Sequence, residues 1–115
     1  MGIDDAQSTG AIRAAFDAGI NTFDSAEAYG KGHAERILGA ALSDVRNKVI
    51  LATKVSPNRL GYDQVFNACH GSLKRLGTDY IDLYQIHWPS GSFGGRVVPI
   101  EETMAAMIRL KEQGK

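Results

Sequence analysis

The sequence has few of the features that mark secreted, disulfide-bonded or membrane proteins. Cys69 is its one cysteine, so a disulfide within the chain is excluded and a reducing compartment is favoured. No basic stretch followed by an apolar one opens the sequence, and no apolar run approaches the length of a membrane span. We therefore expect a cytoplasmic protein with no signal peptide and no membrane partner.

An excess of charge of either sign is also missing. Lysine and arginine together number 13, as do aspartate and glutamate, so the formal net charge is zero and a nucleic-acid partner is not favoured. His33 and His70 have no metal-ligand spacing with Cys69 or with each other, so no metal site is expected. The 115 residues suffice for one domain, and the 43% of apolar residues is ordinary for a globular protein.

Helical and strand patterns alternate along the chain. Apolar spacing, glycines and prolines predict four helices, at 5–18 (capped by Asp4 or Asp5), 35–42, 63–76 and 100–113. Between them they predict three strands, at 20–24, 48–55 and 79–88. Alternation of this kind indicates parallel strands joined by right-handed crossovers. The expected class is α/β, with about three parallel strands and four helices in a single domain, residues 1–115. Three strands cannot close a barrel, so both sheet edges should be open.

Each predicted strand carries an ionisable residue near its carboxyl end. These residues are Asp24, Lys54 and His87, and alternate residues of a strand share one of its faces. The carboxyl ends of parallel strands lie side by side, and active sites of (β/α)₈ barrels occupy that end. Tyr29, in the glycine-rich loop after the first strand, can fold over the same rim.

The four side chains together suit proton transfer to a carbonyl oxygen. A phenol has a pKa near about 10, and a neighbouring ammonium lowers it. Lys54 can supply that ammonium, and Asp24 can hold it in place. His87 can hydrogen-bond the oxygen that Tyr29 protonates. None of these groups donates hydride, so a reduction requires a nicotinamide cofactor.

Taken singly, each residue has an ordinary structural interpretation. Asp24 can cap a turn, Lys54 can be a solvated lysine, His87 can be a hydrogen-bonded core residue and Tyr29 a loop tyrosine. Their joint occurrence on three consecutive strand ends favours the functional interpretation.

Four motifs resemble the aldo-keto reductase family, in the family's order. They are "GINTFDSAEAYG", "GHAERILGAAL", "ILATKV" and "YIDLYQIHWP". The resemblance covers nearly the whole chain and implies the part of a (β/α)₈ TIM barrel from its first helix to its fourth. It also implies NADPH-dependent reduction of an aldehyde or ketone to an alcohol, with a small carbonyl compound as substrate.

The resemblance assigns roles residue by residue. Tyr29 is the general acid and Lys54 the ammonium beside it. Asp24 pairs with Lys54 and lies near the nicotinamide ribose, so it counts as both catalytic and cofactor-binding. His87 orients the carbonyl, and Trp88 helps to form the wall of the substrate pocket.

The extent of the match leaves an alternative open. In the family, strands later in the barrel hold most of NADPH, so residues 1–115 lack much of the cofactor-binding half. The alternative is a catalytically inactive, truncated barrel fragment that self-associates through its open sheet edges. Exposed Ile50, Ile81 and Leu83 on the inward face would favour such association.

The remaining candidates have structural interpretations. Cys69 is expected to be a small buried side chain on a helix stripe. Glu27 and Glu35 are expected at the surface or ordering a loop, and Arg75 at a charged helix end. Met104 is expected to pack in the core.

Overall fold

Three parallel strands and four helices make up the computed structural model, which describes residues 5–115. The helices are α1 (Asp5–Asp17), α2 (His33–Leu42), α3 (Tyr62–Leu76) and α4 (Ile100–Glu112), and the strands are β1 (Thr22–Asp24), β2 (Ile50–Val55) and β3 (Leu83–Ile86). A short 3-10 turn, η1 (Tyr29–Gly32), leads into α2. The predicted α/β class and its element order are confirmed. Of the two predicted caps of the first helix, Asp4 lies outside the described residues.

The sheet has the order β1-β2-β3, with each strand parallel to its neighbour. Asp24 pairs with Ala52, and Lys54 pairs with Gln85. Since residues two apart share a strand face, this register places Asp24, Lys54 and Gln85 on one face of the sheet.

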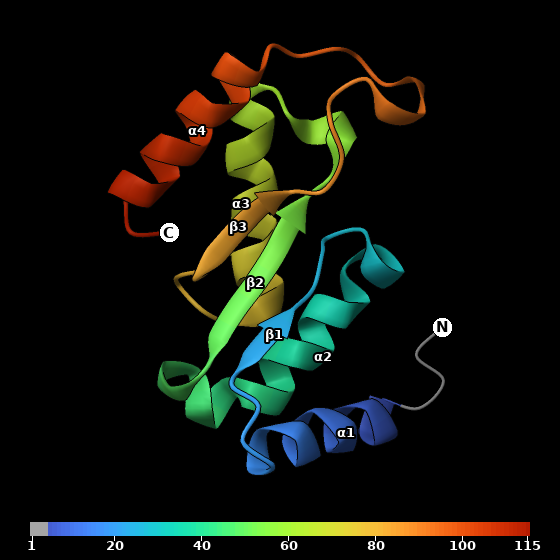
Figure 1. Cartoon of the computed structure of the whole chain (residues 1–115), viewed down its shortest axis with the longest axis vertical. Helices are drawn as coiled ribbons and strands as arrows, with labels where there is room; N and C mark the ends of the chain where they lie inside the picture. Colours follow the sequence, from blue (N-terminus) through green and yellow to red (C-terminus); the bar gives the residue numbers. More distant parts are fainter. Residues whose placement is uncertain (1–4) are drawn as a thin grey trace.

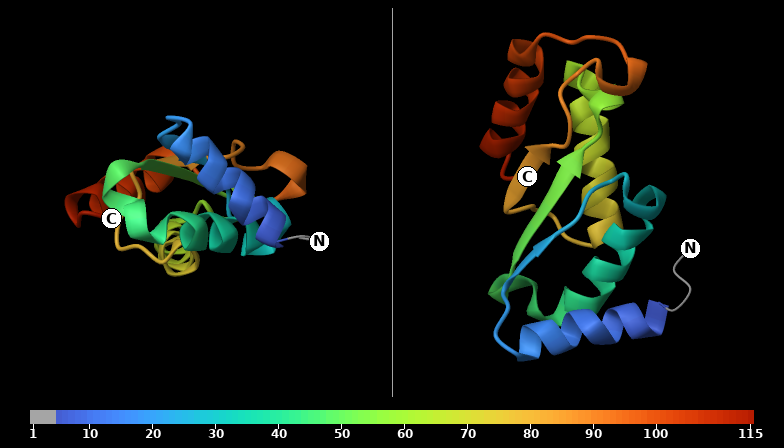
Figure 2. Two further views of the ribbon diagram at one scale, coloured as in Figure 1. Left: turned by 90° about the horizontal axis from the view of Figure 1, so that it is seen from below. Right: turned by 45° about the vertical axis from the view of Figure 1, so that its right-hand side comes forward.

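Helices cover the other face (Figures 1 and 2). In both figures α2 and α3 lie against one side of the strands, α4 flanks β3, and α1 lies across the end of α2. The main core fills the space between sheet and helices, and includes Leu38, Leu42, Leu51, Val65, Cys69, Leu76 and Leu110. Within the described residues no helix covers the opposite face, where Ile50 is 44% exposed and Leu83 is 53% exposed. The sheet therefore has one buried and one open side.

The third strand is shorter than the predicted 79–88, and one consequence corrects an expectation. Ile81 is only 8% exposed and packs in the main core, so its predicted exposure on the inward face is wrong. The reason is a polar anchor at Asp82, whose carboxylate accepts hydrogen bonds from the Leu51 amide and from Arg46. With Asp82 held in this way, β3 begins only at Leu83. Ile81 lies before the strand, so its side chain does not share the face of Leu83 and packs in the core instead.

The first strand also begins later than predicted. The Ile20 amide donates to the carbonyl of Ala15, 3.0 Å away, and so belongs to the turn that ends α1. Gly19 adopts φ +104° in that turn, a conformation that favours glycine. The ladder with β2 therefore starts only at Thr22.

Two further expectations have opposite outcomes. Cys69 is 1% exposed, as predicted, and burial raises the pKa of its thiol to about 11. Met104 is 41% exposed, so its predicted core position is wrong, whereas Met107, one turn of α4 later, packs against the core.

None of the helices in residues 5–115 combines the length and apolar character needed to cross a membrane.

A close approach of α2 to α3 gives a stability prediction. A Cβ on Gly39 would lie 2.5 Å from the carbonyl carbon of Leu76, so Gly39→Ala must push the two helices apart. We expect it to lower the free energy of unfolding by about 1–3 kcal/mol despite the better helix propensity of alanine. Urea unfolding followed by circular dichroism measures the change.

The matched control is Gly10→Ala within α1, where an added Cβ would meet no atom within 4 Å. Here helix propensity acts alone, and we expect a gain of about 0.5–1 kcal/mol. Equal effects of the two substitutions would contradict the close packing at Gly39.

Candidate active site

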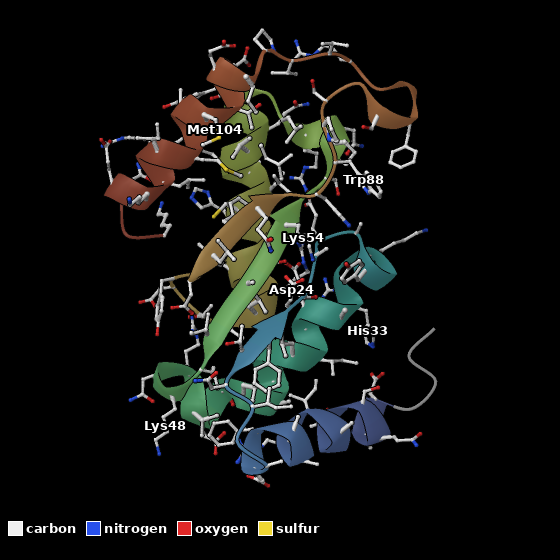
Figure 3. The ribbon with its side chains drawn as sticks, viewed as in Figure 1. Asp24, His33, Lys48, Lys54, Trp88 and Met104 are labelled. Carbon is white, nitrogen blue, oxygen red and sulfur yellow. The ribbon has the colours of Figure 1, made fainter. Side chains whose placement is uncertain are left out.

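Asp24 and Lys54 meet at the carboxyl ends of β1 and β2 (Figure 3). The Lys54 ammonium donates to Asp24 Oδ2 at 2.8 Å and to the carbonyl of Ser25 at 2.9 Å. Its side chain is only 14% exposed, whereas that of Asp24 is 53% exposed. The lysine is thus fixed in a sheltered position, and the carboxylate keeps one side open to solvent.

Tyr29 completes a second contact to the same ammonium. Lys54 Nζ lies 3.4 Å from the phenol oxygen and 5.0 Å from the centre of the ring. Tyr29 begins the η1 turn, in which Gly30, Lys31 and Gly32 all have positive φ. These three residues follow Tyr29 and turn the chain into α2, whereas the Glu27 amide, which donates to the carbonyl of Lys54 at 3.2 Å, holds the segment before Tyr29 at the strand ends.

His87 lies just past the end of β3 and joins the cluster through its ring. Its amide donates to the carbonyl of Val55 at 3.1 Å, which extends the sheet pairing by one residue. The His87 and Tyr29 rings meet edge to face, with centres 5.6 Å apart. The predicted proximity of Asp24, Tyr29, Lys54 and His87 is therefore present in the structure, while their catalytic roles stay predictions.

An aromatic wall continues from His87. Trp88 stacks on the His87 ring with centres 5.9 Å apart, and Phe93 meets Trp88 edge to face at 5.7 Å. These three side chains and Ser56 help to line a pocket of about 360 Å³. Figure 3 shows Trp88 on the same end of the sheet as Lys54 and Asp24. The pocket with its aromatic side chains and the Asp24–Lys54 pair therefore lie at the same end of the sheet.

The charge state of Lys54 follows from its surroundings. Burial by itself lowers the pKa of Lys54, but hydrogen bonds and charge attraction from Asp24 and Tyr29 outweigh burial, so its pKa is raised. The group is therefore an ammonium at neutral pH, ready to stabilise negative charge on the phenol oxygen.

Gln85 is a site residue to which sequence reasoning gave no role. Its amide nitrogen lies 3.1 Å from Asp24 Oδ1 and donates to it, so both carboxylate oxygens of Asp24 are engaged. The available signal was strand alternation, because Gln85 precedes His87 by two residues and shares its face.

Glu27 and Glu35 differ from their predicted surface positions. Glu27 is 8% exposed; it accepts hydrogen bonds from the Ser56 amide and from Arg59, and so ties the loop after β1 to the loop after β2. Its predicted loop-ordering role is confirmed, but a surface position is not. Glu35 is fully buried and pairs with Arg75 at 2.7 Å, so Arg75 is not simply a charged helix end.

The residues present fit one end of a nicotinamide cofactor. The half-exposed carboxylate of Asp24 can accept a hydrogen bond from a ribose hydroxyl, and the phenol of Tyr29 is exposed beside it. Among residues 5–115, no group of three or more histidine, cysteine, aspartate or glutamate side chains is arranged to hold a metal ion.

Comparison with known proteins gives concordant matches. The family model described as the aldo/keto reductase family matches residues 1–115. The chain is 49% identical over 105 residues to the methylglyoxal reductase YeaE of Escherichia coli, an alignment covering 91% of this chain and 35% of that protein. It is 44% identical to the aldo-keto reductase YhdN of Bacillus subtilis, covering 99% of this chain and 36% of that protein.

A solved structure shares the architecture as well. The crystal structure of an aldo-keto reductase from Klebsiella pneumoniae in complex with NADPH superimposes with a TM-score of 0.88 at 39% identity, covering 96% of this chain and 37% of that one. The chain therefore spans between 35% and 37% of the length of these three relatives.

Proposed function

Since the chain belongs to the aldo/keto reductase family, we propose that it forms the proton-donating part of an enzyme that reduces aldehydes or ketones to alcohols with NADPH. The contact of one lysine ammonium with both Asp24 and Tyr29 carries this proposal. It is supported by a relative named methylglyoxal reductase and by a structural neighbour in complex with NADPH.

In the proposed reaction Tyr29 gives its proton to the carbonyl oxygen of the substrate. Lys54 stabilises the phenolate that remains, and Asp24 keeps Lys54 charged and in place. His87, in ring contact with Tyr29, donates a hydrogen bond to the same oxygen and orients it. Trp88 shields the carbonyl from water on one side. NADPH, when bound, supplies the hydride for the carbonyl carbon.

A hybrid enzyme tests this function. Residues 1–115 replace the matching segment of YeaE, with which they share 49% identity over 105 residues, and methylglyoxal reduction is followed by the loss of NADPH absorbance. We expect NADPH-dependent turnover. A hybrid that folds and binds NADPH but has no turnover would refute the proposed contribution of this chain.

For residues 1–115 alone we propose little or no turnover. Much of the cofactor-binding half assigned by the resemblance lies on strands other than the three present here, and hydride transfer requires a nicotinamide held against the carbonyl. Titration of NADPH into the pure chain, read by fluorescence, with an aldehyde assay, measures both properties. Tight binding together with turnover would show the proposal to be wrong.

Self-association of the 115-residue chain is a second candidate property. The open sheet face exposes Ile50 by 44% and Leu83 by 53%, and the free edges of β1 and β3 can pair with another strand. We expect a dimer or a larger species by size-exclusion chromatography with light scattering. Leu83→Lys should shift the population toward monomer, and a monomeric parent at high concentration would contradict the prediction.

A further inference from the structure

A buried polar network lies directly behind the candidate active site. Glu35 of α2 is 0% exposed, and its two oxygens have different partners. Oε2 accepts a hydrogen bond from the Thr53 hydroxyl at 2.6 Å, and Oε1 accepts one from Arg75 Nε at 2.7 Å. One carboxylate thus connects β2 to α3 across the helix–sheet interface.

The first connection reaches the strand next to Lys54. Thr53 is fully buried and immediately precedes Lys54 in β2. Because neighbouring strand residues point to opposite faces, the Thr53 hydroxyl faces Glu35 while the Lys54 side chain faces the site. Glu35 therefore holds β2 from behind at the level of the lysine.

The second connection reaches the turn that carries Tyr29. A Cβ on Gly32, the last residue of η1, would lie 2.6 Å from Arg75 Cδ and 2.8 Å from Nε, so the arginine side chain lies flat against this glycine. Gly71 also makes room, since a Cβ there would lie 3.1 Å from Arg75 Nη1. The Arg75 side chain therefore packs between the η1 turn and Gly71 of its own helix, α3.

The η1 turn depends on contacts of this kind. Lys31 adopts φ +54°, an uncommon conformation for a residue with a side chain, which persists only where surrounding structure enforces it. Gly32 follows with φ +93° and meets Arg75 directly. The arginine is therefore placed to fix the position of the turn relative to the sheet.

We infer that Glu35 and Arg75 are a pair of positioning residues that set the separation of Tyr29 from Lys54. Thr53 anchors the lysine side of that separation, and Arg75 anchors the tyrosine side through Gly32. Neither Glu35 nor Arg75 lines the pocket beside His87 and Trp88. The inference rests on the proposed function, because this separation matters for catalysis only if Tyr29 is the acid.

Nuclear Overhauser spectroscopy on the 115-residue chain tests the inference without any need for turnover. Lys54 Nζ lies 5.0 Å from the Tyr29 ring centre, so a cross-peak is expected between the lysine Cε protons and the tyrosine ring protons. The Tyr29 signals are identified by their loss in Tyr29→Phe. The test variant is the double substitution Glu35→Gln with Arg75→Met, which removes both buried charges together and so leaves neither one unpaired.

We expect this double variant to keep a native-like spectrum and to lose the cross-peak. The matched control is Arg46→Met with Asp82→Asn, which removes a comparably short ion pair, 2.9 Å, from residues outside the site. The control should be destabilised as well but keep the cross-peak. Retention of the cross-peak in the test variant, or its loss in both variants, would overturn the inference.

Two single substitutions give the test a second, graded measurement. Glu35→Gln preserves the hydrogen bond to Thr53 but removes the charge that holds Arg75, so the cross-peak should weaken. Arg75→Lys keeps a cation and an aliphatic chain beside Gly32, so it should retain more cross-peak intensity than Glu35→Gln. The opposite order would contradict a positioning role, and none of these outcomes depends on whether the hybrid reductase is active.

Discussion

Replacing Tyr29 with phenylalanine in the hybrid reductase is expected to lower kcat by about 10²–10⁴-fold, the range of contributions from a positioned general acid. The substitution removes one oxygen, which lies 3.4 Å from the Lys54 ammonium. The ring contact with His87 can stay in place, so we expect little change in NADPH affinity. Steady-state kinetics with methylglyoxal and a fluorescence titration of NADPH measure the two effects.

Tyr62→Phe is the control for the loss of a phenol oxygen. Tyr62 is 39% exposed, close to the 42% of Tyr29, and its ring packs on Phe66 at the start of α3. Its substitution should leave kcat unchanged. The opposite outcome is a Tyr29→Phe variant that keeps more than about a tenth of the parent kcat. That decrease is smaller than the smallest one expected from the loss of a general acid, so Tyr29 would not be the acid.

Replacing Arg75 alone with methionine is expected to lower the free energy of unfolding by about 3–5 kcal/mol, the usual cost of leaving one member of a buried ion pair without its partner. Glu35 is fully buried, and Arg75 is the only cation within 4 Å of it among the described residues. A loss of this size is a large fraction of the about 5–15 kcal/mol by which native proteins are stable. Urea unfolding monitored by circular dichroism measures it.

The double variant Glu35→Gln with Arg75→Met separates the cost of a lone charge from the cost of lost packing. It should recover most of the stability, because the neutral glutamine side chain that replaces Glu35 can still accept the hydrogen bond from Thr53. If the double variant were as unstable as Arg75→Met, packing of the arginine rather than charge pairing would dominate. That result would contradict the predicted origin of the effect.

Sequence reasoning anticipated which side chains lie close together because it depended on short-range regularities. A strand places alternate residues on one face, and parallel strands align their carboxyl ends, so Asp24, Lys54 and His87 could be assigned to one rim. The family resemblance then assigned their roles and added Tyr29. Gln85 shares that face but received no role, since its role consists of a contact with Asp24 across the sheet.

The errors concern burial rather than the order of elements. Ile81 lies on a run that alternates like a strand, but Asp82 binds the Leu51 amide and Arg46 and so delays β3. Met104 fits a helical apolar stripe, but it lies on a part of α4 that no described element covers, and it is 41% exposed. Local periodicity identifies a face of a helix or strand without identifying what packs against it.

The sequence by itself determined the alternation of helices and strands, the family, and the rim on which the ionisable side chains gather. Only the tertiary structure decided that Glu35 is buried and that its partner is Arg75, 40 residues away. The physical reason is one of range. Strand and helix geometry is set by neighbours along the chain, whereas burial of a charge depends on segments brought together by folding. A carboxylate on a helix therefore has the same local sequence pattern whether it is buried or exposed.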